Sequence, residues 1–75
     1  MLGFPSREEV DKLREKYPKG TRIQLGYMKD DYSPLTPGSE GTVTHVDDAG
    51  QIHMAWDSGS SLALIPGEDV FTKIE

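Results

Sequence analysis

The sequence predicts a mostly β fold, a small five-stranded barrel with one N-terminal α-helix. Beyond residue 21, short runs of residues alternate between apolar and polar side chains, which is typical of strands with one buried face. Turns rich in Gly and Asp separate these runs at short intervals. A chain of 75 residues buries little surface, so closing the sheet into a barrel would remove strand edges that it otherwise exposes.

The first predicted element is a helix over residues 6–18. Ser6 and Glu9 stand at the spacing of a capping box, in which each side chain bonds the backbone N–H of the other, and Pro18-Lys19-Gly20 ends the helix. A helix of about three turns is marginal alone, so its apolar face must dock on the rest of the chain. That face consists of Val10, Leu13 and Tyr17.

The barrel is predicted over residues 21–75, within a single domain of residues 1–75. A loop of residues 29–38 contains two prolines, and Ile65–Asp69 has the composition of a single helical turn. The strands are expected at Thr21–Tyr27, on either side of the turn Asp47–Gly50, at Ser60–Leu64 and at Val70–Ile74.

This order of elements is the layout of an SH3-like small barrel: a long loop after the first strand, tight turns around the third and a helical turn before the last. The helix is expected to plug one open end of the barrel or to cover one face. The residues expected inside are Ile23, Leu25, Val43, Ile52, Met54, Leu62 and Ile74.

Two stretches of the chain resemble known families. The hairpin of residues 41–59 resembles that of small-barrel modules of the KOW and Mib-Herc types, which implies a fold rather than a function. Residues 7–74 resemble a small bacterial family of unknown function, the domain of unknown function 4314 type, found in phages and integrating elements. This resemblance implies a mobile-element setting and brings no catalytic residue with it. It rests on the segments REEV, PKGTR, PG, GTV and DDAGQIHMAWDSGSSLALIPGED.

Charge is unevenly distributed along the chain, whose formal net charge is −5. Residues 1–29 carry seven basic and four acidic residues, giving +3, whereas residues 30–75 carry one basic and nine acidic residues, giving −8. The acidic body disfavours DNA binding over the whole surface and leaves nucleic-acid contact to the N-terminal segment. The chain has no cysteine and no apolar run near the ~20 residues that cross a bilayer. We expect a soluble cytoplasmic protein without membrane contact.

Two histidines stand at the centres of the predicted second and third strands. If Gly50 forms a bulge after the turn, His45 lies opposite His53, whereas a loop without a bulge places His45 opposite Ile52. The sequence leaves both registers open. Two imidazoles fall short of the three or four ligands of a zinc site, so no metal site and no cofactor are predicted. A hydrolase triad drawn from nearby serines and Asp57 would be arbitrary, so no catalytic residue is predicted.

A partner-binding surface is predicted where the loop after the first strand meets the turn before the last. Aromatic and proline side chains there are of the kind that SH3-like barrels place beside extended peptides. Acidic side chains at the same place would steer a basic partner. The residues predicted for this surface are Asp30, Asp31, Tyr32, Pro34, Glu68 and Asp69.

The sequence therefore favours a non-enzymatic binding module of a bacterial phage or mobile element that acts by protein–protein contact. Two alternatives stay open. One is a phage counter-defence inhibitor of the anti-CRISPR kind, which would block a host nuclease with an acidic surface. The other is a nucleic-acid accessory protein that binds through its basic N-terminal helix, and such binding would weaken steeply with salt. The sequence does not predict the oligomeric state.

Overall fold

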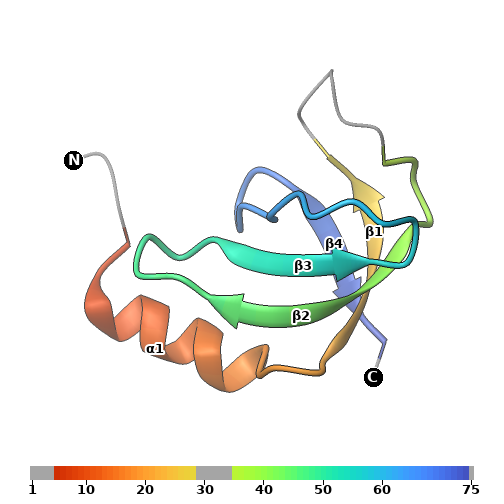
Figure 1. Ribbon diagram of the computed structural model, residues 1–75. Helices are drawn as coiled ribbons and strands as arrows, with labels where there is room; N and C mark the ends of the chain where they lie inside the picture. The colour runs from red at the N-terminus through yellow and green to blue at the C-terminus, as the bar shows by residue number, and fades with distance from the viewer. Residues whose placement is uncertain (1–4, 29–34, 75) are drawn as a thin grey trace.

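The computed structural model describes residues 5–28 and 35–74. One helix, α1 (Arg7–Lys16), precedes four strands that form one antiparallel sheet in the order β3-β2-β1-β4. Figure 1 shows the sheet curving so that β4 lies behind β2 and β3, with α1 beneath β2. The strands are β1 (Arg22–Tyr27), β2 (Glu40–Val46), β3 (Ile52–Trp56) and β4 (Val70–Lys73).

The capping box confirms the predicted start of α1. The Glu9 N–H donates to Ser6 Oγ over 3.1 Å, and the Ser6 N–H donates to Glu9 Oε1 over 2.9 Å. At the other end, the Tyr17 N–H donates to the carbonyl of Leu13. Val10 and Tyr17 are buried and Leu13 is partly buried, so the predicted apolar face does dock on the core. Within the described residues α1 is the sole helix, and its ten residues fall well short of crossing a lipid bilayer.

A bulge in β1 overturns the simple alternation expected of that strand. Leu25 pairs with Phe71 and Tyr27 pairs with Val70, which leaves Gly26 as an extra residue. A Cβ at Gly26 would lie 3.1 Å from the carbonyl oxygen of Val70, so the bulge brings the two backbones close. Tyr27 therefore leaves the buried face on which Ile23 and Leu25 lie, and it is 55% exposed.

The described residues form a four-stranded open sheet where the sequence predicts a closed barrel of five strands. The predicted fourth strand, Ser60–Leu64, meets β3 at one residue pair, in which Ile52 and Leu64 exchange two backbone hydrogen bonds. Elsewhere the Trp56 N–H donates to the Ser60 carbonyl, the Leu62 N–H donates to Ser60 Oγ, and the Leu62 carbonyl accepts from the Trp56 indole over 2.8 Å. These bonds keep the segment beside β3 without making it a strand.

A single hydrophobic core lies between the sheet and α1. Five of the seven residues predicted for the interior are buried, while Leu62 is only partly buried. The prediction for Ile74 is wrong: its N–H bonds the carbonyl of Arg22, a pairing that puts both side chains on the outer face, and Ile74 is 42% exposed. The buried core is Val10, Tyr17, Ile23, Leu25, Leu35, Val43, Val46, Ile52, Met54, Trp56 and Leu64.

Candidate functional site

A groove with a volume of about 680 Å³ opens between α1 and two turns, the one after β2 and the one before β4. We call it the α1 groove. Apolar and charged side chains share its lining, and none of the described residues that line it is aromatic. Its apolar side chains are Pro5, Leu13, Ala49, Ile65 and Pro66, its charged ones are Glu9, Lys12, Lys16 and Glu68, and Gly50 and Gln51 complete it.

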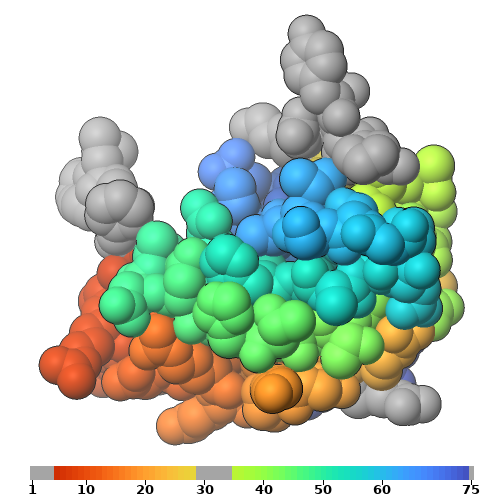
Figure 2. Space-filling model, viewed as in Figure 1, coloured from red at the N-terminus to blue at the C-terminus, as the bar shows by residue number. Residues whose placement is uncertain are grey.

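Arg14 holds α1, the first wall of the groove, against the hairpin that follows. Its Nε donates to the carbonyl of Val46 over 3.1 Å, and its Nη2 donates to Asp48 Oδ1 over 2.8 Å. Figure 2 shows the surface of α1 packed directly against that of the turn after β2. With Arg14 turned to the hairpin, Lys12 and Lys16, one helical turn apart, line the groove.

Asp47 shapes the turn that forms the second wall. Its Oδ1 accepts the N–H groups of Ala49 and Gln51 over 3.0 and 2.9 Å. Gly50 follows with a φ of +81°, and a Cβ there would lie 2.7 Å from Pro5 Cγ. Only glycine satisfies both the backbone angle and this close approach, so the turn can lie against the start of α1.

The third wall is the turn of residues 65–69, which is closed by Asp69. The Ile65 N–H donates to Asp69 Oδ2 over 2.8 Å, and the Ile65 carbonyl accepts the N–H groups of Glu68 and Asp69. The backbone polar groups of Ile65 are thus satisfied within the turn. Ile65 lines the groove and is 38% exposed, so it offers apolar surface there.

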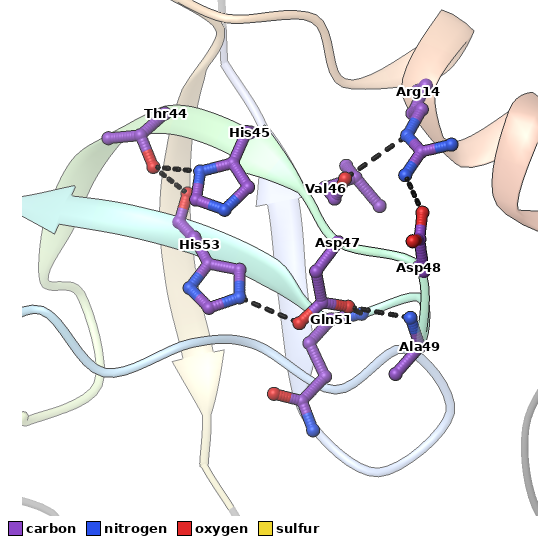
Figure 3. Close-up of polar contacts among 9 residues, drawn as sticks. All are labelled: Arg14, Thr44, His45, Val46, Asp47, Asp48, Ala49, Gln51 and His53. Atoms are coloured by element: carbon purple, nitrogen blue, oxygen red, sulfur yellow. Dashed lines mark hydrogen bonds and ion pairs between the residues drawn. The ribbon is translucent and has the colours of Figure 1, made fainter.

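The two histidines form a second cluster, on the opposite face of the sheet from the core. The structure selects the register with the Gly50 bulge, so His45 lies opposite His53. Their rings stack with centroids 4.3 Å apart and planes within 5° of parallel (Figure 3). A further bulge at Thr44 turns His45 outward beside its partner.

Hydrogen bonds orient both rings. His53 Nε2 lies 2.8 Å from Asp47 Oδ2, and because an ionised carboxylate only accepts, Nε2 carries the hydrogen. Thr44 Oγ1 donates to the carbonyl of His53 over 3.1 Å, so it accepts from His45 Nδ1, 3.2 Å away. The hydrogen bond from His53, followed by those from Gln51 and Ala49, holds the pKa of Asp47 below its usual range.

This arrangement disfavours a shared metal ion. The lone pairs of His45 and His53 lie in two parallel ring planes and do not converge on one point. No group of three or more ligand side chains with metal-binding geometry occurs among the residues the structure describes. The contacts of these histidines with each other, with Thr44 and with Asp47 join β2, β3 and the turn between them, which is the second wall of the groove.

A third polar cluster surrounds Arg22 on the outer face of the sheet. Its guanidinium binds Asp57 in bidentate fashion over 2.8 and 2.7 Å and also reaches Thr42 and Glu40. This pairing lowers the pKa of Asp57 and raises that of Arg22. The carboxylate of Asp57 therefore binds Arg22 of β1 and does not orient the ring of either histidine.

Comparison with known proteins identifies the family of this chain. Residues 6–74 match the family described as domain of unknown function (DUF4314). The chain belongs to the DUF4314 family. No curated protein and no solved structure matches it.

The residues predicted to bind a partner have different placements in this DUF4314 domain. Glu68 lines the α1 groove, whereas the carboxylate of Asp69 accepts the Ile65 N–H beside it. The other predicted residues, Asp30, Asp31, Tyr32 and Pro34, lie outside the described residues. Of the predicted surface, the structure therefore places Glu68 at the α1 groove, which residues of α1 also line.

The helix side of the DUF4314 groove was missed from the sequence. The helical spacing predicts that Leu13 docks on the core, and it does not indicate that Leu13, Lys12 and Lys16 line a groove. The sequence does contain one local signal of the contact between the helix and the turn. Pro5 stands directly before the capping box, and Gly50 ends a turn, where glycine permits a close approach of another segment. Their mutual contact is a tertiary feature that alternation and spacing do not encode.

Proposed function

We propose that this chain is a non-enzymatic binding module of a phage or another bacterial mobile element, at work in the cytoplasm, and that it holds a segment of a partner protein in the α1 groove. The observation that carries this proposal is the groove itself, with its exposed Ile65 and its charged rim. Small-molecule pockets favour enclosure and aromatic lining, whereas this groove is open and the described residues that line it are aliphatic, polar or charged. We also propose that the sheet is a reduced SH3-like barrel, a reading supported by the strand order and by the single Ile52–Leu64 pair.

The chemistry of the groove favours a particular kind of segment. Leu13, Ile65 and Pro66 offer an apolar surface for one anchoring side chain. On the α1 wall, the positive charges of Lys12 and of Lys16, whose ammonium lies 5.5 Å from the centroid of the Tyr17 ring, complement an acidic residue next to that anchor. The partner segment is therefore expected to combine a large apolar residue with an acidic one.

A selection from a random peptide library tests this function with matched variants. The purified chain is used as bait, and the affinity of the selected peptides is measured by calorimetry. Ile65→Asp should weaken binding at least about tenfold, because it places a charge against the apolar anchor. Ile74→Asp should not, because Ile74 is similarly exposed but lies outside the groove.

A second matched pair tests the charge preference. Lys12→Glu should weaken the same peptides, whereas Lys19→Glu should leave them unchanged, because Lys19 is exposed and lies away from the groove. Peptides without acidic residues, or equal binding to the parent and to Ile65→Asp, would contradict the proposal.

The inhibitor alternative receives less support from the described residues. An acidic decoy needs unpaired carboxylates, but Asp48 pairs with Arg14, and Asp57 pairs with Arg22. Asp47 is likewise engaged by His53 and by backbone N–H groups.

The nucleic-acid alternative rests on Lys12 and Lys16. Binding through these side chains would fall steeply between low and high salt, and Lys12→Glu would abolish it for any sequence. A salt titration with a duplex DNA probe distinguishes it from peptide binding anchored on Ile65.

A further inference from the structure

The outer edge of β4 carries backbone groups without a partner in the described chain. β4 ends the sheet order, so only one of its two edges is paired, with β1. The Ile74 N–H bonds the Arg22 carbonyl, and hydrogen-bonded pairs alternate along an antiparallel ladder. The N–H and C=O groups of Phe71 and Lys73 therefore point away from β1. Within residues 5–28 and 35–74, no residue takes them up.

Apart from the shortness of β4, this edge lacks the usual protection of edge strands. It contains no proline, and its one charged side chain, Lys73, is tied down, because its ammonium donates to the carbonyl of Lys16 over 3.2 Å. Beside it, Val70 is 59% exposed and Ile74 is 42% exposed on the outer face. An open edge flanked by exposed apolar residues is a template for pairing with another strand.

The residues of β4 make the edge complementary to itself in one antiparallel register. Pairing Phe71 with Phe71 of a second copy would put Lys73 opposite Asp69, whose N–H is already bonded to Ile65. Pairing Lys73 with Lys73 of a second copy would set like charges face to face. Pairing Phe71 with Lys73 of a second copy lets all the outward N–H and C=O groups bond.

We propose that β4 binds β4 of a second copy in this register, with Thr72 facing Thr72 across a two-fold axis. Each Val70 then lies opposite Ile74 of the other copy, so the two most exposed aliphatic residues of the edge cover one another. The two sheets join into one continuous sheet. This inference is independent of what occupies the α1 groove.

The dimer is weak and depends on concentration. An edge of four residues buries well under the ~800 Å² per partner of a stable complex. Its consequence is bivalence, because two copies joined at β4 present two α1 grooves to a partner that repeats its binding segment.

The chain contains no cysteine, so one introduced thiol reports the register directly. Facing residues of a non-hydrogen-bonded pair have Cα atoms about 4.5 Å apart, a distance that a disulfide spans. Thr72→Cys should form a disulfide-linked dimer in a glutathione redox buffer at least about tenfold faster than Ala55→Cys. Ala55 is the matched control, since it is exposed on the outer face of β3, away from the β4 edge. Equal rates for the two variants would overturn the proposal.

A charge exchange in the Thr72→Cys background tests the side-chain pairs. Adding Val70→Lys and Ile74→Lys sets like charges opposite one another and should slow cross-linking, whereas adding Val70→Lys and Ile74→Glu sets opposite charges together and should restore it. Both variants carry two new charges on the same strand, and circular dichroism melting shows whether each remains folded. If the two folded variants cross-link equally fast, the register is wrong. If either variant unfolds, the unmodified chain is tested by sedimentation equilibrium instead. It should show a dimer at high concentration, and a monomer at every concentration would overturn the proposal.

Discussion

Asp47 ties the turn after β2 to the ring of His53 in β3. Its Oδ1 holds the turn through Ala49 and Gln51, and its Oδ2 accepts from the ring of His53. The sequence indicates the first role, because aspartate favours turns by bonding nearby N–H groups. The second role depends on the bulge at Gly50, which the sequence offered as one of two registers. Local chemistry thus predicted the turn and left the histidine contact undecided.

Replacing Asp47 by asparagine should destabilise the fold in a way that depends on pH. The pKa of Asp47 is lowered by folding, chiefly by His53, so its carboxylate stabilises the folded state above the unfolded pKa of about 3.9. The difference in unfolding free energy between parent and Asp47→Asn should be about 1–2 kcal/mol at pH 7. It should disappear as the pH falls below the unfolded pKa and through the lower folded pKa.

Urea unfolding at several pH values measures this difference, and Asp48→Asn is the control in the same turn. The Asp48 side chain is fully exposed and its one described partner is Arg14, so its replacement should change stability little at any pH. A constant difference between parent and Asp47→Asn from pH 7 to pH 2 would show that the charge of Asp47 plays no part.

At the scale of elements, the start of α1 and the strand positions followed from local signals, and the failures came from contacts between elements. The capping box of Ser6 and Glu9 needs only the residues around it. The side chain of Tyr27 lies off the buried face because β1 bulges at Gly26, where β4 approaches closely. Alternation within β1 alone does not predict this bulge. The Ser60–Leu64 segment meets β3 at one bridge, because the Trp56 indole and Ser60 Oγ bond the backbone groups of Leu62. The α1 groove belongs to the same class, since it exists only where a helix meets two turns.

Val10 tests how α1 is held to the sheet. It is 2% exposed, so Val10→Ala should cost about 2 kcal/mol and lower the melting temperature by about 10 °C, although alanine favours a helix. Leu13→Ala should cost less, because Leu13 is only partly buried and also lines the groove. Lys12→Ala, at an exposed position of the same helix, should change the melting temperature little. Small effects from all three would mean that α1 is not part of the core.

The whole molecule should unfold as one unit, because helix and sheet share a single core. Val10 from α1 and Tyr17 at its C-terminal cap belong to the same buried cluster as Trp56 from β3, and Tyr17 also packs edge-on against Phe71 of β4. Trp56 is the only tryptophan, so its fluorescence reports on the sheet, while circular dichroism at 222 nm reports largely on α1. The two urea midpoints should coincide. Separate midpoints, with the helix signal lost at lower urea concentration, would show that α1 unfolds while the sheet stays folded. The α1 groove would then exist only while the helix is folded.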